Sequence, residues 1–116
     1  MIIDKLWGYE NIIVNTDLYC GKIIHVNAGK RGSFHYHKIK DETFYLLKGK
    51  VEINYSLTDE FYTDTIILNE GDKFYLPPGL RHQIVGIEDS DIIEFSTKDM
   101  DEDSYRVIHS EDFLWM

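Results

Sequence analysis

Short apolar runs separated by turn-forming residues recur along the 116-residue sequence, and they constrain its fold more than any other feature. Each run is rich in Ile, Val, Tyr and Phe and is bounded by Gly, Asn, Asp or Pro, a pattern typical of β-strands. No segment sustains the spacing of three and four residues that an amphipathic helix requires. We therefore predict an all-β sandwich or barrel. The expected strands are 9–14, 20–26, 33–37, 43–47, 51–55, 61–68, 73–76, 82–85 and 92–96.

The length favours a single domain spanning residues 1–116, because two ordinary domains would need a longer chain. The sequence starts without the apolar stretch of a signal peptide, and no run reaches the roughly 18 apolar residues of a membrane span. The single cysteine, Cys20, fits a reducing compartment. We therefore expect a cytoplasmic protein with no membrane partner.

Acidic residues outnumber basic ones by 21 to 12, which gives a formal net charge of −9. Such a surface repels phosphate backbones, so we expect no nucleic-acid partner. Part of the charge lies in the acidic run 99–103, which is typical of a solvated loop. An anionic substrate would need local positive charge, and Lys38, Lys40 and Arg81 lie close in sequence to the candidate site described next.

Two histidines share one face of the expected strand 33–37, because successive side chains of a strand point to opposite faces. His35 and His37 are thus about 7 Å apart along the strand and can converge on one ion. Imidazole suits first-row transition metals, and a carboxylate such as Glu42 adds a harder oxygen ligand. With His82 as a third imidazole, the set leaves one or two coordination positions open.

The spacing of these residues resembles the two motifs of the cupin superfamily. The first motif matches at Gly29, His35, His37, Glu42 and Gly49, and the second at Gly71, Pro77, Gly79 and His82. One position departs from the pattern, because the second motif usually closes with Asn where this sequence has Gly86. The resemblance implies a small double-stranded β-helix, or jelly-roll barrel. It also implies one divalent metal (Mn, Fe, Zn or Ni) on His35, His37, Glu42 and His82.

Other interpretations exist for single residues. An isolated His-x-His pair is more often a pair of surface histidines, and His25 and His109 are expected to be structural or exposed. Glu94 is a charged residue between Ile93 and Phe95. It either faces solvent or points into the barrel, where it would be a general base or would orient a ligand imidazole.

Several stretches also resemble small single-domain cupins related to mannose-6-phosphate isomerases, among them 7–10, 35–38, 41–45 and 93–97. This implies a sugar or sugar-phosphate isomerase or epimerase with Glu94 as the catalytic proton carrier, and a homodimer. The segment 2–9, which contains Trp7, would then reach across a two-fold axis. An iron-dependent dioxygenase and a non-catalytic sugar-binding module are the alternatives, since one barrel with one metal hosts many functions.

Overall fold

The computed structural model describes residues 1–59 and 64–108, and nearly all of its regular structure is β-strand. The elements are β1 (Ile2–Lys5), β2 (Gly8–Asn15), β3 (Cys20–Val26), β4 (Phe34–Tyr36), β5 (Glu42–Lys48), β6 (Lys50–Ser56), β7 (Asp64–Asn69), β8 (Lys73–Leu76), β9 (Arg81–Gly86), β10 (Ser90–Ser96), the 3-10 helix η1 (Asp101–Asp103) and β11 (Tyr105–Ile108).

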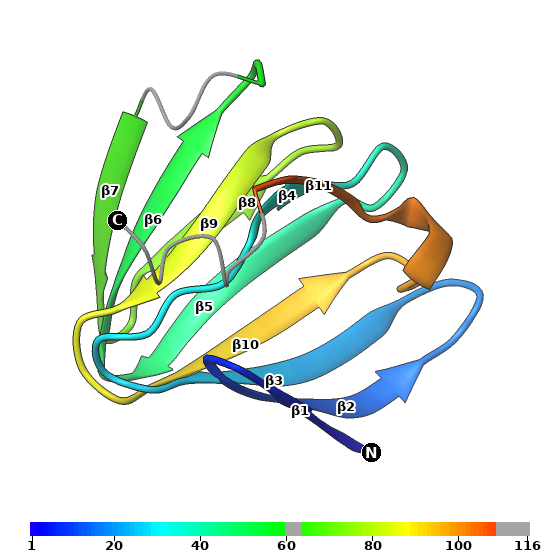
Figure 1. Cartoon of the computed structure of the whole chain (residues 1–116). Helices are drawn as coiled ribbons and strands as arrows, with labels where there is room; N and C mark the ends of the chain where they lie inside the picture. The colour runs from blue at the N-terminus through cyan, green and yellow to red at the C-terminus, as the bar shows by residue number, and fades with distance from the viewer. Residues whose placement is uncertain (60–63, 109–116) are drawn as a thin grey trace.

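The strands form two antiparallel sheets that face each other (Figure 1). A six-stranded sheet has the order β1-β2-β3-β10-β5-β8, and a five-stranded sheet has the order β11-β4-β9-β6-β7. Strands far apart in sequence are neighbours, such as β3 with β10 and β4 with β9. The predicted all-β jelly roll is therefore confirmed.

The expected strands are present, with ends that differ by a few residues. The expected strand 61–68 appears as β7 from Asp64, and residues 60–63 lie outside the described residues. The prediction missed two strands. β1 is only four residues long, and β11 follows the acidic run that indicated a loop. Both lie at the edges of their sheets, where pairing to a neighbour decides the structure more than local composition does.

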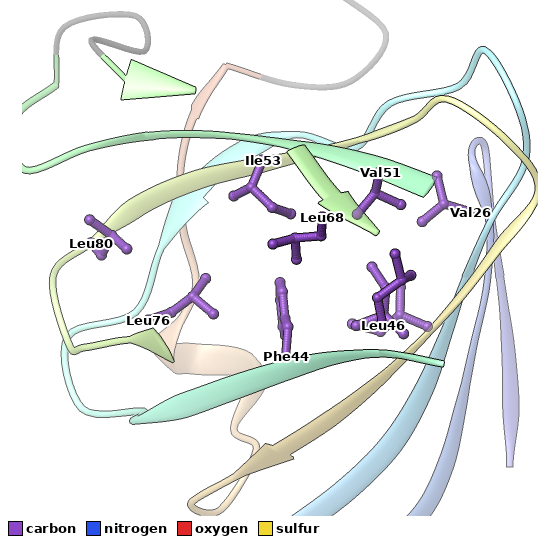
Figure 2. Packing of buried hydrophobic residues seen from close by; sticks show 10 residues of the cluster. Val26, Phe44, Leu46, Val51, Ile53, Leu68, Leu76 and Leu80 are labelled. Carbon is purple, nitrogen blue, oxygen red and sulfur yellow. The ribbon is translucent and has the colours of Figure 1, made fainter. Parts of the chain in front are cut away.

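The interior divides into an apolar end and a polar end because strand side chains alternate. Ile24, Ile92 and Leu46 form one cross-strand row that points inward from β3, β10 and β5. Leu46 packs with Val51, Ile53 and Leu68 of the opposite sheet (Figure 2), and Ile24 and Ile92 belong to the same buried cluster. Two residues along the same strands, the inward row is Lys22, Glu94 and Phe44. Burial of charge in this second row indicates where the functional site lies.

The N-terminal strand pairs within its own chain. β1 pairs with β2, and Leu6 and Trp7 in the turn between them line the barrel cavity. The backbone N–H of Asn27 donates a hydrogen bond to the carbonyl of Trp7 (2.9 Å), which fixes this hairpin on the barrel. We expected the segment 2–9 to reach across a two-fold axis. In this single chain its strand β1 pairs instead with β2 of the same chain. Among the described residues, no helix has the length and apolar character to span a membrane.

Gly86 replaces the usual Asn because the structure leaves no room for a side chain there. A Cβ at this position would overlap the carbonyl oxygen of Asn27 and lie 2.9 Å from Cγ1 of Val26. The backbone of Gly86 also exchanges hydrogen bonds with the 29–30 turn, from Gly29 N–H and to the Lys30 carbonyl, each 2.8 Å. The two spaced motifs therefore meet at their ends through a contact that only glycine allows.

Introducing the Asn that usually closes the second motif, with Gly86→Asn, is expected to lower the free energy of unfolding by about 2–4 kcal/mol, because the backbone of Asn27 must move away. Gly71→Asn is the matched control. Its φ of +88° strains any side chain, Asn least among non-glycine residues, but a Cβ there meets nothing within 4 Å, so Gly71→Asn should cost less than Gly86→Asn. Urea denaturation compares the two variants with the native chain, and equal losses in both would contradict the steric explanation.

Candidate metal centre

Three histidines meet at the polar end of the barrel. His35 on β4 lies directly opposite His82 on β9, and His37 follows one residue after β4 ends. The potential ligand atoms of these three side chains all lie within 4.8 Å of one another. Strand alternation brings His35 and His37 to the same face, and the β4–β9 pairing adds His82 from the neighbouring strand.

Each ring is held by a backbone carbonyl. Nδ1 lies 2.9 Å from the Leu80 oxygen in His82, 2.6 Å from the Asp103 oxygen in His37, and 3.2 Å from the Ser33 oxygen in His35. Nδ1 of His35 also lies 3.1 Å from Oγ of Ser33, which can donate or accept. A carbonyl oxygen can only accept, so Nδ1 of His37 and of His82 carries the proton and each of these neutral rings keeps Nε2 as a lone-pair donor. This is the tautomer in which a metal-binding histidine is oriented by its other nitrogen.

Glu42, the first residue of β5, completes the group from the opposite sheet. Its Oε2 is 3.4 Å from Nε2 of His37 and 3.9 Å from Nε2 of His82. The structure therefore brings together all four side chains that the sequence predicted as ligands. Three imidazole nitrogens with one carboxylate oxygen form a donor set suited to a first-row divalent ion.

Burial sets the protonation of this group. It lowers the pKa of His82 to about 4 and the pKa of His35 well below its usual value, while His37 is lowered less. Burial, with the neighbouring Glu94 carboxylate, raises the pKa of Glu42. The imidazoles are thus already in the neutral form that a metal requires. Burial disfavours the negative charge of the Glu42 carboxylate, and a bound cation would balance that charge.

Asp103 holds the loop between two ligands, although the acidic run 99–103 predicted a solvated loop. Its buried carboxylate accepts hydrogen bonds from the backbone N–H groups of Lys38 (2.9 Å), Ile39 (3.2 Å) and Lys40 (2.9 Å). Its carbonyl accepts the Nδ1–H of His37. One residue of η1 therefore fixes both the ring of His37 and the path of the chain toward Glu42. Composition alone cannot single out this carboxylate from its acidic neighbours.

The four side chains line a cavity of about 790 Å³, and residues of the N-terminal hairpin line it as well. Trp7 and the buried Ile24 and Phe44 supply apolar surface to its lining. Glu94 also lines it and is only 2% exposed, so it faces the cavity rather than solvent. Ser96 Oγ donates a hydrogen bond to Glu94 Oε2 (2.9 Å), which fixes the direction of the carboxylate.

Two buried lysines share the wall with Glu94. Lys40 Nζ lies 2.7 Å from Glu94 Oε2 and 2.8 Å from Asp99 Oδ1. Lys22 Nζ lies 3.4 Å from Asp99 Oδ2 and 3.5 Å from Glu10 Oε1. Burial alone would lower the pKa of both ammonium groups, but the Glu94 charge raises it, so both stay protonated. For Glu94 burial acts in the opposite sense, and the two lysines outweigh it and lower the pKa.

The sequence identified only one of the lysines at this site. Lys38 and Arg81 do not line the cavity. The ammonium of Lys38 lies over the ring of Tyr105, and the guanidinium of Arg81 lies over Tyr36. The sequence-based prediction missed Lys22, although strand alternation could have identified it. Lys22 alternates with Cys20 and apolar residues on the inward side of its strand. A charged residue within an apolar strand was also the feature that drew attention to Glu94.

Replacing Asp99 with Asn is expected to lower the free energy of unfolding by about 1–2 kcal/mol at neutral pH, because two buried ammonium groups lose a charged partner. Burial would raise the pKa of Asp99, but Lys40 and Lys22 lower it. As pH falls, the unfolded carboxyl takes up its proton first. The stabilisation is therefore present above about pH 4 and is lost as pH falls through the lowered folded pKa. Urea denaturation of both proteins at neutral and acid pH measures it; a difference that persists undiminished at low pH would contradict the ion pair.

The remaining histidines lie away from the metal centre or outside the described residues. His25 is on the outer side of β3, with Nδ1 2.6 Å from Asp91 Oδ1 and its ring stacked on Tyr9. Its contacts are those of a residue that joins β2, β3 and β10. His109 lies outside the described residues.

Comparison with known proteins places these features in a family context. The cupin domain profile matches residues 22–95. KdgF from Halomonas sp. has a TM-score of 0.75 at 22% identity, covering 88% of this chain and 89% of that one. The capsular polysaccharide assembling protein CapF from Staphylococcus aureus has a TM-score of 0.74 at 21% identity, covering 90% and 33%.

Oxalate decarboxylase from Bacillus subtilis has a TM-score of 0.77 at 18% identity, and the match covers 91% of this chain and 29% of that one. The chain thus spans most of KdgF but only about a third of the other two proteins. At these identities the likeness is one of fold. Comparison with the curated proteins found no relative.

Proposed function

The chain belongs to the cupin domain family, and from that premise we propose that it is a divalent-metal-dependent enzyme that acts on a sugar or sugar phosphate as an isomerase or epimerase. The metal is Mn, Fe, Zn or Ni, held by His35, His37, Glu42 and His82. One observation carries the proposal: a pre-oriented set of three neutral imidazoles and a carboxylate lines the same cavity as a second, inward-pointing carboxylate.

The second carboxylate is Glu94, and its surroundings suit a proton carrier. It lines the same cavity as the metal centre, and Lys40 and Ser96 hold its Oε2. The bound ion supplies Lewis acidity that makes the C–H next to a substrate carbonyl more acidic. In the isomerase reaction the Glu94 carboxylate takes the proton from one carbon and delivers a proton to the neighbouring carbon, while the proton of the hydroxyl group passes to the other sugar oxygen. Exchange of the Glu94 proton with solvent introduces deuterium in D₂O.

Turnover on a panel of sugars and sugar phosphates tests the proposal. The protein is reconstituted separately with each of the four metals, and proton NMR in D₂O follows product formation together with deuterium entry at the carbon next to the carbonyl. We expect both with at least one metal, and neither in the His35→Ala/His37→Ala variant. Oxygen consumption with Fe(II) alone would instead indicate a dioxygenase, and binding without turnover would indicate a sugar-binding module.

The remaining proposals concern the state of the whole chain. We propose that residues 1–116 form one domain and that the protein is cytoplasmic. The buried, unpaired Cys20 supports a reducing compartment.

We also propose that the protein is a homodimer and that two copies meet on the outer face of the six-stranded sheet. Phe95, Thr43 and Tyr75 form an uncharged cross-strand row there, and the two aromatic side chains are 57% and 56% exposed. Because the chain has a net charge of −9, two copies repel each other. The repulsion is weakest where the facing surfaces carry no charged side chains. Aromatic residues are typical of interface centres.

Light scattering at micromolar concentration is expected to give twice the chain mass of 13.7 kDa. Phe95→Glu should give monomers because a buried unpaired charge opposes association. Leu18→Glu, at an 82% exposed position between β2 and β3, is the control and should remain dimeric. A monomeric native protein would remove the proposal.

A further inference from the structure

The cavity wall beside the metal centre carries charges that are already paired. Lys22 and Lys40 have side chains only 5% and 2% exposed, and they point into the cavity from β3 and from the loop before β5. Buried ammonium groups in a substrate cavity commonly suggest an anion-binding site. Here, however, each lies within 4.0 Å of at least two carboxylates, drawn from Glu10, Glu94 and Asp99.

The two positive charges thus face three negative ones. A phosphate entering this wall would have to displace Asp99 or Glu94 from a lysine and leave that carboxylate unpaired in a largely buried site, which is costly. The other basic side chains that line the cavity, Lys5 and Arg106, are exposed, and Asp4 and Asp101 line the cavity with them. Among the described residues, the buried wall of the cavity therefore offers no ammonium group without a carboxylate within 4.0 Å.

A hydroxyl group fits the same wall without disturbing it. It can donate to a carboxylate and accept from an ammonium group, and the carboxylates and ammonium groups alternate from Glu94 through Lys40 and Asp99 to Lys22. Neighbouring hydroxyls of one molecule can bridge successive pairs. Phe44 and Trp7 supply apolar surface in the same cavity for the carbon skeleton.

We propose that the substrate is an uncharged polyhydroxylated molecule, a sugar without a phosphate group, and that Glu10 and Asp99 exclude phosphorylated analogues. This inference rests on the proposed function for its substrate class. It narrows that class from sugars and sugar phosphates to the unphosphorylated sugars.

The first experiment needs no turnover and uses inorganic phosphate as the probe. Calorimetric titration of the zinc-loaded protein is carried out on the native chain and on the double variant Glu10→Gln/Asp99→Asn. We expect the double variant to bind phosphate at least about tenfold more tightly, because two carboxylates no longer compete for the lysines. Adding Lys22→Met should reverse the gain, which separates wall binding from phosphate bound by the metal itself.

Glu52→Gln/Asp64→Asn is the matched control, because it removes the same net charge from the five-stranded sheet at positions that do not line the cavity. It should leave phosphate binding unchanged. If the double variant does not fold, as judged by circular dichroism, Glu10→Gln alone should give a smaller gain. The proposal is wrong if the native protein already binds phosphate through Lys22. It is also wrong if removal of the two carboxylates raises phosphate affinity no more than the control variant does.

The second experiment compares matched substrates. For D-mannose and D-fructose, kcat/KM on the free sugar is measured against the corresponding 6-phosphate, and we expect a preference of at least about tenfold for the free sugar. A preference for the phosphate would overturn the inference. Absence of turnover on every sugar would count against the proposed function, while the phosphate titration would still decide the charge argument.

Discussion

The His35→Ala/His37→Ala variant is expected to contain no stoichiometric metal while it keeps its β-sheets. Both rings lie on one strand face beside His82, so their removal leaves one imidazole and one carboxylate. Loss of a residue that merely orients a ligand costs about 10–100-fold in metal affinity, so loss of two ligands should exceed that range. Elemental analysis of untagged protein purified without added metal gives the stoichiometry, and circular dichroism reports the fold.

His25→Ala provides the matched control. It removes an imidazole of the same chain whose partners are Asp91 and Tyr9 on the outer face of the sheet. Its metal content should equal that of the native protein. One equivalent of tightly bound metal in the double variant would show that the assignment of the site is wrong.

Glu94→Gln is expected to retain metal and to lower turnover by a factor of about one hundred or more. The amide keeps the shape of the side chain and can still accept from Lys40, but it cannot take a proton at neutral pH. Metal content and kcat are measured on the same preparation, with deuterium entry in D₂O as the direct report of proton transfer.

A purely structural Glu94 predicts a different result. Its carboxylate also neutralises Lys40 and Lys22, so Glu94→Gln should lower thermal stability whatever its chemical role. Deuterium entry measured well below the melting temperature separates the two roles, because only a proton carrier changes it there. Glu52→Gln, on the outward side of β6, is the control for loss of a carboxylate. If both variants exchange deuterium at the native rate, the base is another residue.

The convergence of His35 and His37 was predictable from local rules, whereas Glu42 and His82 were predicted as ligands through the resemblance of their spacing to the two cupin motifs. Alternation along a strand brings His35 and His37 to one face, and the spaced glycines and prolines mark the turns around them. The inward position of Glu94 was left open, since a charged residue in an apolar strand fits either face until the neighbouring strands are known. The pairing of β10 with β3 and β5 decides it, by placing Glu94 between Lys22 and Phe44.

Other parts of the site depend on contacts between distant segments. Asp103 reaches residues 38–40 only because β11 pairs with β4 and brings η1 beside the first motif. Trp7 reaches the cavity because β1 folds back on β2. The composition of the segments around Asp103 and Trp7 does not indicate either contact. Neither residue belongs to the two spaced motifs.

The direct opposition of His35 and His82 across β4 and β9 has a consequence for the order of folding events. These strands are far apart in sequence, and Glu42 begins a strand of the other sheet. The complete set of ligands therefore exists only after both sheets have closed, late on the path from the unfolded chain. A metal ion that binds this late stabilises the native state without helping the chain to reach it. Its effect should fall on the rate of unfolding, so that loaded protein unfolds more slowly while it folds as fast as before.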